Sequence, residues 1–331
     1  MEKEFDIFGL GSAIMDILIQ VDDHTLASFD LTKGGMTLVD EETVLELDKR
    51  IRPYQPVMIP GGSAANTVAG VAHIGGSAVF CGLIGDDEHG LIYERKTIEK
   101  GIASRLGHEQ GLTGRAITFI TPDSERTFAT HFGVAINVGK EHVLEEDILK
   151  SRIAHFEGYQ LEGPRTREAV LHAMAIAKKA GVLVSFDVSD PYLIKRTNAD
   201  MQRIIDEFVD IVFCNEEEAK ALTGVEESAA AESLSKRTKI AVVKLGKRGS
   251  IIRQGEDEWS VDAYPASPVD TTGAGDMFAA GFLYGFARGA SPETCGKLGS
   301  FSAAKIVEKV GARLDDPIRE EIDRILKTDE E

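Results

Sequence analysis

Short apolar runs alternate with helical stretches along the second half of the chain. The runs lie at residues 153–156, 182–186, 211–213 and 240–243, and the helical stretches include residues 164–180 and 201–207. Apolar runs of this length are typical of strands that are buried on both faces. The alternation therefore predicts an α/β fold, in which a central, mostly parallel sheet lies between two layers of helices.

The first half of the chain adds strands of two kinds. Residues 5–10 and 78–84 have the apolar composition of further buried strands, and helices are expected at residues 41–50, 64–74 and 91–100. Residues 116–121 and 126–132 flank Pro122-Asp123-Ser124-Glu125, a turn sequence that predicts a hairpin. Together with the segment after Asp16 and a short strand at residues 36–39, this hairpin is expected to form a small separate sheet.

The small sheet is expected to serve as a lid, built from about residues 16–45 and 112–133. Two helices are expected near the C-terminus, at residues 292–310 and 317–326. The length of 331 residues is compatible with one domain or two, and we expect a single domain over residues 1–331 that carries the lid within it.

Composition and charge narrow the classes of partner. The chain has 37 Lys and Arg against 55 Asp and Glu, a net charge of −18, which argues against nucleic acid or an anionic membrane as a partner. Residues 53–85 carry no formal charge, but prolines and glycines interrupt them, so no membrane span is expected. Cys81, Cys214 and Cys295 lack metal-binding or disulfide spacing, and the start of the chain does not resemble a signal peptide. We therefore expect a cytoplasmic protein.

The strongest chemical signal is the stretch VDTTGAGDMFAAGF at residues 269–282. Gly273, Ala274 and Gly275 allow backbone N–H groups to approach a ligand, and a helix beginning there adds its free first-turn N–H groups and the positive end of its dipole. The carboxylate of Asp276 at the rim of this anion socket is placed to accept a proton from a group that attacks a phosphate. That is kinase chemistry, although an ordinary loop in which Asp276 caps the next helix explains the pattern alone.

Further candidates follow the predicted strands, where ligands of parallel sheets bind. Asn215 and Glu218 share one face of a helix start, so they are able either to order waters around Mg²⁺ or to form a capping box. The basic glycine turn at residues 244–249 suits nucleotide phosphates, and a plain hairpin turn is the alternative. The acids at residues 86–88 have the composition of helix-start charges rather than of a metal cluster.

Two features near the N-terminus suit a polyhydroxylated substrate. Asp16 is an isolated acid in an apolar segment, which indicates either a solvent-facing strand end or a carboxylate that accepts hydrogen bonds from sugar hydroxyls. The glycine loop at residues 61–66 opens a helix, and Gly62 and Asn66 are placed to contact a flat substrate, although a plain helix entry explains the loop equally well.

Taken together, these motifs resemble the PfkB, or ribokinase-like, family of carbohydrate and nucleoside kinases. The matching segments are DTTGAGD at residues 270–276, GGSAAN at residues 61–66, and the Asn-x-x-Glu element of Asn215 and Glu218. The resemblance extends over nearly the whole chain and implies a ribokinase-like fold, ATP and Mg²⁺ as cofactors, and in some relatives K⁺.

The resemblance also implies residue roles. Asp276 is the general base, and the N–H groups of Gly273, Ala274, Gly275 and Asp276 form the anion hole. The acceptor contacts Asp16, Gly62 and Asn66. The nucleotide contacts Asn215, Lys244, Gly246, Gly249 and Thr271, and Glu218 holds the metal through water.

Residues 156–159 and 33–36 resemble the adenosine-kinase-like branch of this family. Tyr159 is then the candidate for stacking on a base, with a core aromatic as the alternative. Residues 188–191 (VSDP) depart from the Asp-Pro-Asn sequence of many sugar kinases, which leaves the acceptor open. We expect transfer to the 5′-hydroxyl of an adenosine-like nucleoside. A kinase of ribose, fructose or a related furanose is the alternative, and a silent nucleoside-binding protein is disfavoured by the intact Asp276. The oligomeric state, monomer or homodimer, stays open.

Overall fold

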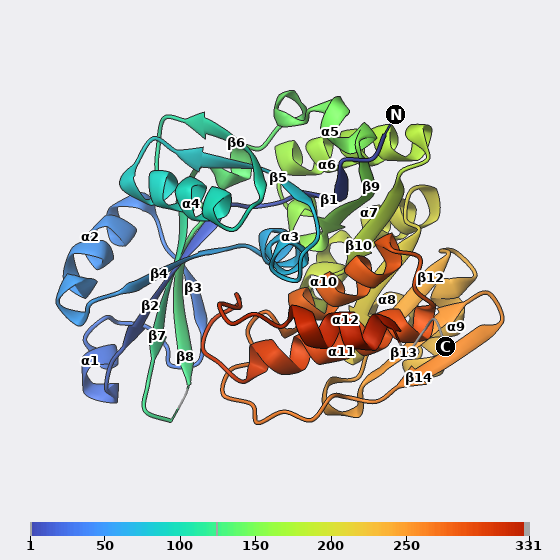
Figure 1. Cartoon of the computed structure of the whole chain (residues 1–331). Coiled ribbons are helices and arrows are strands. Elements are labelled where there is room, and N and C mark those ends of the chain that lie inside the picture. Colours follow the sequence, from blue (N-terminus) through green and yellow to red (C-terminus); the bar gives the residue numbers. More distant parts are fainter. Residues whose placement is uncertain (1, 124, 328–331) are drawn as a thin grey trace.

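The computed structural model describes residues 2–123 and 125–327, and these contain one large and one small sheet (Figure 1). The large sheet has nine strands. In order across the sheet they are β14 (Asp257–Val261), β13 (Ser250–Gln254), β12 (Ile240–Lys244), β11 (Ile211–Asn215), β10 (Leu183–Asp187), β9 (Ser151–Glu157), β1 (Phe5–Leu10), β5 (Ala78–Gly85) and β6 (Ala103–Glu109). The strands from β12 to β6 pair in parallel, whereas β13 and β14 are antiparallel at one edge. The predicted mostly parallel sheet is confirmed.

Helices cover both faces of the large sheet, because its strands are apolar on both sides. Ile7 and Phe8 of β1 point to opposite faces and belong to two different buried apolar clusters. The first cluster includes α3 (Ser63–His73), α4 (Glu88–Glu99), α10 (Ala274–Ala287), α11 (Pro292–Val307) and α12 (Arg319–Lys327). The second includes α5 (Glu145–Leu149), α6 (Pro164–Ala180), α7 (Pro191–Glu207), α8 (Glu216–Thr223) and α9 (Glu227–Ser235).

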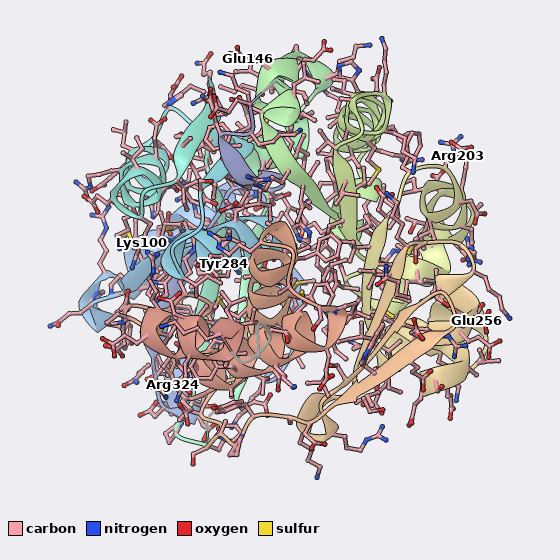
Figure 2. The ribbon with its side chains drawn as sticks, turned by 45° about the vertical axis from the view of Figure 1, so that its right-hand side comes forward. Lys100, Glu146, Arg203, Glu256, Tyr284 and Arg324 are labelled. Atoms are coloured by element: carbon pink, nitrogen blue, oxygen red, sulfur yellow. The ribbon has the colours of Figure 1, made fainter. Side chains whose placement is uncertain are left out.

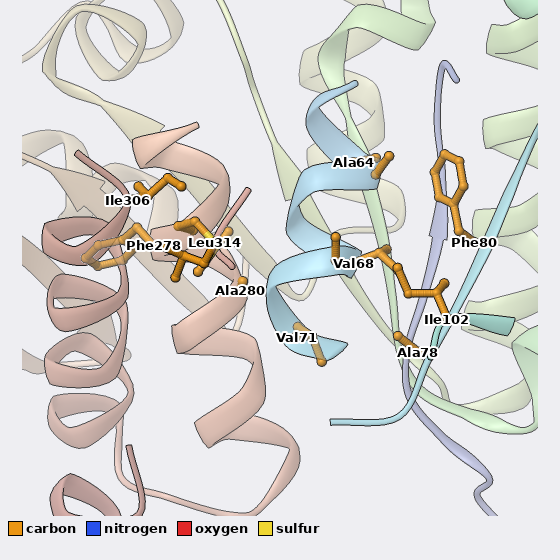
Figure 3. Packing of buried hydrophobic residues seen from close by; sticks show 14 of the residues in the cluster. Ala64, Val68, Val71, Ala78, Phe80, Ile102, Phe278, Ala280, Ile306 and Leu314 are labelled. Atoms are coloured by element: carbon orange, nitrogen blue, oxygen red, sulfur yellow. The ribbon is translucent and has the colours of Figure 1, made fainter. Parts of the chain in front are cut away.

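Helix α3 lies between the large sheet and α10 (Figure 3). Val68 and Ala64 face the sheet, and the opposite side of α3 packs against α10 at Ala280. This approach is close because residue 70 is glycine: a Cβ there would lie 2.6 Å from Cβ of Ala280. The tight packing brings the N-terminal ends of α3 and α10 together, and both ends carry candidate site residues.

The small sheet has five strands, in the order β3 (Met36–Leu38), β8 (Arg126–His131), β7 (Gly114–Ile120), β2 (Ile14–Gln20) and β4 (Val57–Gly61). Its outer face is covered by α1 (Asp23–Ala27) and α2 (Glu41–Ile51), whose apolar residues join Ile17 and Phe119 in the first cluster. The hairpin predicted at residues 116–121 and 126–132 is confirmed as the antiparallel pair β7 and β8. Residue 124 of its turn lies outside the described residues.

We call the side of the small sheet that carries Asp16 its inner face. The register of the strands places residues of this face in rows. One row runs Leu38, Thr130, Ala116, Asp16 and Ile59, and the next runs Met36, Phe128, Thr118, Leu18 and Val57. Apart from Asp16 and two threonines, these rows are apolar, and Met36, Leu38 and Val57 are exposed.

The structure corrects several expectations. Asp16 lies in the middle of β2, between Ala116 and Ile59 of the neighbouring strands, so its interpretation as a solvent-facing strand end is wrong. Strand β4 was not expected because Pro60 lies within it, but β4 is at a sheet edge, where proline is tolerated. Strands β6 and β14 and helix α9 were also not expected, and α7 begins ten residues before the predicted 201–207 helix, at Pro191.

Charged side chains point outward over the surface, as Arg203, Glu256 and Arg324 illustrate, whereas Tyr284 of α10 is buried (Figure 2). Among the described helices, none combines the length and apolar character that crossing a membrane requires. The division of the chain into a single domain with a lid stays a prediction.

Candidate active site

The side chain of Asp276 is held by helix α3. Helix α10 has Gly273 as its N-cap, with φ of +76°, and Asp276 is in its first turn. The hydroxyl of Ser63 donates to Oδ1 of Asp276 at 2.8 Å, and Nδ2 of Asn66 donates to Oδ2 at 3.0 Å. Because these donors lie on another helix, the carboxylate of Asp276 is aimed across the junction of α3 and α10, which a simple helix cap does not explain.

The loop before Gly273 is braced by Asp270, which is buried. Its carboxylate accepts from the backbone N–H of Gly311 at 2.6 Å and from that of Thr272 at 3.0 Å. Arg126 of β8 contacts Asp270 and also donates to the hydroxyl of Thr272 at 2.8 Å. One arginine of the small sheet is therefore tied directly to the glycine loop that precedes α10.

The start of α10 forms a positive socket. The N–H of Ala274 is engaged in a turn with the carbonyl of Thr271 at 3.2 Å, whereas the N–H groups of Gly275 and Asp276 lie in the first turn, where the helix offers no carbonyl partner. A Cβ on Gly275 would lie 3.2 Å from Nζ of Lys244, so the ammonium group of Lys244 lies against this helix start. Backbone donors, helix dipole and ammonium group together suit a phosphate.

Lys244, the last residue of β12, is paired with Asp187, the last residue of β10, across the intervening strand β11. Its Nζ donates to Oδ2 of Asp187 at 2.8 Å, and both side chains are largely buried. Burial by itself lowers the pKa of Lys244, but the carboxylates of Asp187 and Glu218 outweigh burial and raise it. Lys244 therefore stays charged beside the anion socket.

Asn215 and Glu218 form the capping box that was the alternative reading of this pair. The N–H of Glu218 donates to Oδ1 of Asn215 at 2.9 Å, and the N–H of Asn215 donates to Oε2 of Glu218 at 2.7 Å. Residues 86–88 are helix-start charges, since Asp87 caps α4 by accepting from Gly90 N–H at 2.9 Å. In residues 2–123 and 125–327 there is no group of three or more His, Cys, Asp or Glu suited to a metal ion. The role of Glu218 toward a metal stays a prediction.

A cleft of about 980 Å³ opens from the anion socket along the ends of β11 and β12. All residues that were assigned to the nucleotide line it: Asn215, Lys244, Gly246, Gly249 and Thr271. Its lining also includes apolar side chains, among them those of Tyr264, Phe278 and Val307. The cleft therefore combines charged groups with apolar surface, a combination that suits a nucleotide.

Tyr159 lies in this same cleft, among the residues assigned to the nucleotide. Its side chain is 47 % exposed, so the alternative of a core aromatic is wrong. Its hydroxyl donates to the carbonyl of Ser189 at 3.5 Å. Stacking of Tyr159 on a base stays a prediction, and its position on the nucleotide side was not foreseen.

Asp16, Gly62 and Asn66 gather on the other side of Asp276. The backbone of Gly61 lies so close to Asp16 that a Cβ there would collide with its carboxylate, and Gly62 has φ of +95°. Asn66 links this group to the carboxylate of Asp276, to which its Nδ2 donates. Burial raises the pKa of Asp16 to about 7, although the nearby positive charges of Arg313 and Arg126 oppose the shift.

Several residues of the site were missed or given no role from the sequence. Glu157 and Asp187 are the last residues of β9 and β10, a position that signals a ligand site in a parallel sheet, but no motif named their function. Glu157 accepts from the N–H of Ala64 at 3.0 Å, and burial raises its pKa to about 7. Ser63 lies within the glycine motif but was given no role, and Arg126 and Arg313 gave no local signal, because only the folded chain brings these side chains to Asp276 or Asp270.

The buried carboxyl groups predict that stability depends on pH. Burial raises the pKa values of Asp16, Glu157 and Glu218 to about 7 and that of Asp276 to about 6. Between pH 8 and 6.5 the folded protein takes up protons on these groups, whereas the unfolded chain, with Asp and Glu pKa values near 4, does not. The free energy of unfolding should therefore rise as pH falls through this window. We expect Tm without nucleotide to be roughly 2–5 °C higher at pH 6.5 than at pH 8.

The variant Glu157→Gln keeps an acceptor for Ala64 but removes one titrating group, so it should flatten this dependence. Glu146→Gln on the exposed surface is the control and should not change it (Figure 2). His155 opposes the trend as pH falls below about 7, because burial lowers its pKa to about 4 while the unfolded chain, with a His pKa near 6.5, takes up the proton. A Tm that is flat or falls from pH 8 to 6.5 would contradict the assignment of these groups.

An anion socket, a carboxylate held at its rim and a nucleotide-sized cleft define a phosphotransferase site at the carboxyl ends of parallel strands. The chain belongs to the pfkB family of carbohydrate kinases, whose family model matches residues 23–319. It is accordingly an ATP-dependent kinase of the class that acts on small sugars or nucleosides. The expected ribokinase-like fold is confirmed by the structural neighbours.

Three relatives illustrate the range of this family. A probable sugar kinase from Rhizobium etli superposes with a TM-score of 0.88 at 33 % identity, covering 97 % of this chain and 98 % of that chain. Adenosine kinase from Sinorhizobium meliloti superposes with a TM-score of 0.87 at 33 % identity, covering 97 % and 99 %. The 5-dehydro-2-deoxygluconokinase of Listeria monocytogenes is 30 % identical in an alignment of 320 positions that covers 92 % of this chain and 97 % of the relative.

Proposed function

We propose that the protein transfers the terminal phosphoryl group of ATP to the 5′-hydroxyl of an adenosine-like nucleoside. One observation carries the choice of acceptor: the inner face of the small sheet is apolar around Asp16. A single carboxylate suits the hydroxyls of one sugar ring, and the apolar residues beside it suit a flat, poorly hydrated base. A bare sugar, which has hydroxyls on every side, needs more polar partners than these rows offer.

The reaction follows from the positions of four groups. Asp16 and Asn66 hold the hydroxyls of the acceptor ring, and Asp276 accepts the proton of the attacking hydroxyl. The N–H groups of Gly275 and Asp276, together with Lys244, stabilise negative charge on the transferred phosphoryl group. Catalysis in this scheme is mainly positioning and charge stabilisation, as in other phosphoryl transfers.

The nucleotide is placed in the cleft that Lys244 and Asn215 line. Mg²⁺, typical of the family, would be held by waters that Asn215 and Glu218 orient, and when bound it neutralises phosphate charge. The chemistry of Glu218 suits a cation. Burial raises the pKa of its carboxyl group to about 7, so the group is partly ionised at neutral pH, and a neighbouring cation favours its charged form.

The small sheet acts as a lid in this proposal. Arg126 joins it to the loop at residues 270–272, so movement of the sheet and the position of the anion socket are coupled. A closed lid excludes water, which would otherwise compete with the acceptor for the phosphoryl group.

A sugar kinase is the second candidate, because the resemblance to 5-dehydro-2-deoxygluconokinase is about as strong as that to adenosine kinase. The deciding experiment measures ADP release from Mg-ATP with adenosine, guanosine, inosine, ribose, fructose and 5-dehydro-2-deoxygluconate. Turnover on nucleosides alone supports the proposal. Turnover only on a bare sugar or a sugar acid replaces it with the second candidate.

The variant Phe128→Ala tests the apolar face directly. Phe128 lies in the row next to Asp16, and its loss should raise the KM for the nucleoside about tenfold, because part of the contact with the base is lost. The KM for ATP should change less than twofold. Leu91→Ala, which removes an exposed leucine of α4, is the control and should leave both constants unchanged. An unchanged nucleoside KM in Phe128→Ala would argue against a base on this face.

A further inference from the structure

A buried arginine, Arg313, lies close to Asp276, the candidate general base. Arg313 follows α11 and is only 9 % exposed. Its Nε donates to Oδ1 of Asn66 at 3.3 Å, and its guanidinium also bonds to the hydroxyl of Tyr93. Tyr93 is itself anchored, since its hydroxyl donates to the carbonyl of Gly61 at 2.8 Å. Arg313 is therefore held in place from two sides.

The two ends of the Asn66 amide are chemically different, and Arg313 distinguishes them. A guanidinium group offers donors only, so the oxygen of the amide must face Arg313. The NH₂ end then faces Asp276 and donates to Oδ2 at 3.0 Å. Without Arg313 the amide oxygen loses this partner, and only the bond to Asp276 orients the amide, so the Asn66 donor is held less firmly against the carboxylate.

The segment around Arg313 contacts the catalytic loop at two further points. The N–H of Gly311 donates to Asp270 at 2.6 Å. Ala312 packs against Gly273, where a Cβ would lie 2.9 Å from Cα of Ala312. Residues 311–313 therefore contact three parts of the site. Gly311 bonds to Asp270 of the loop, Ala312 packs against Gly273, and Arg313 holds the amide of Asn66.

We propose that Arg313 is a positioning residue of the phosphoryl transfer, which orients Asp276 through the amide of Asn66. The inference rests on the proposed role of Asp276 as general base. Arg313 acts on the direction and the ionisation of the Asp276 carboxylate and need not touch the acceptor. Arg313 acts on Asp276 only through the side chain of Asn66. Once Asn66 is removed, substitution of Arg313 should therefore have no further effect on Asp276.

A double-mutant cycle tests this dependence. The variants are Arg313→Met, Asn66→Ala and the double variant, each assayed for kcat against pH at saturating ATP and at saturating concentration of the acceptor that turns over in the panel. Arg313→Met should lower kcat about tenfold and move the acid limb of the profile to higher pH, because a less firmly held Asn66 donor stabilises ionised Asp276 less. The KM for ATP should stay within twofold.

In the double variant, kcat and the acid limb should equal those of Asn66→Ala alone. Charged groups near Asp276 other than Arg313 include Asp16, Glu157, Asp187 and Lys244, and they are present in every variant. Equal and additive shifts from Arg313→Met in both backgrounds would overturn the proposal, because they would indicate that the arginine acts on Asp276 through its charge alone. An unchanged acid limb in Arg313→Met would overturn it as well.

Arg237→Met is the matched control, since Arg237 also donates to a side-chain amide, that of Gln202 at 2.7 Å, but far from the site in sequence and fold. It should leave kcat and the acid limb unchanged. If Arg313→Met does not fold, Arg313→Lys takes its place: it keeps the charge and should show a smaller shift of the acid limb in the same direction. Substantial turnover in Asp276→Asn would instead contradict the proposed function, so the two failures are distinguishable.

Discussion

Asp276→Asn should lower kcat about a thousandfold while ATP and acceptor binding stay close to normal. Asparagine keeps the size of the side chain and can still contact Ser63 and Asn66, but its amide cannot take the proton of the attacking hydroxyl. The measurement is steady-state ADP release, with equilibrium binding of both substrates. Asp210→Asn is the matched control: this buried aspartate accepts from Val184 at the opposite end of the strands and should keep full activity.

Near-normal turnover in Asp276→Asn would remove Asp276 from the role of base. A large rise of KM with unchanged kcat would instead make it a binding residue. The wild-type pH profile gives an independent check. Because the pKa of Asp276 is raised to about 6, kcat should fall below pH 6 as the carboxylate becomes protonated, and it should be level above pH 7 if no other group limits the reaction.

Asp16→Ala should raise the KM for the acceptor about a hundredfold. The loss of two hydrogen bonds to a charged group is worth about 3 kcal/mol or more, which corresponds to this factor. The KM for ATP should change less than threefold, since Asp16 lies on the acceptor side of Asp276. Kinetics with each substrate varied in turn measure both constants.

The pKa of Asp16 adds a second readout to this variant. Because this pKa is raised to about 7, the acceptor KM of the wild-type protein should increase as pH falls below 7 and the carboxylate is neutralised. In Asp16→Ala that dependence should disappear. An acceptor KM that is unchanged by the substitution would show that the acceptor lies elsewhere.

Much of the fold was readable from short segments. The strand and helix alternation after residue 153 predicted the parallel sheet, because buried strands and helices have different apolar periods. Strand β4 was missed because proline argues against a strand, and its edge position becomes apparent only when the sheet is assembled. The polar strand β14 was missed for a similar reason, since an edge strand needs no continuous apolar run.

The features of the site also differ in whether adjacent residues were enough to predict them. The helix start that follows Gly273 was predicted correctly, since glycine conformations and a helix start are properties of adjacent residues, whereas the role of its N–H groups as an anion hole stays a prediction. The capping box of Asn215 and Glu218 was likewise an expected alternative, because such a box requires only two suitable residues three positions apart at a helix start. The position of Tyr159 in the nucleotide cleft was not foreseen, since it depends on which strand ends meet.

By itself, the sequence determined the class of fold, the anion socket and the presence of a carboxylate beside it, because each of these arises from periodicity or from contiguous residues. Only the tertiary structure decided what surrounds that carboxylate. Ser63 and Asn66 lie more than 200 residues from Asp276, and Arg126 and Arg313 come from two further segments. Their contacts, and the burial that raises the pKa values of the carboxyl groups in the site, depend on segments that are far apart in the sequence, so no local pattern predicts them.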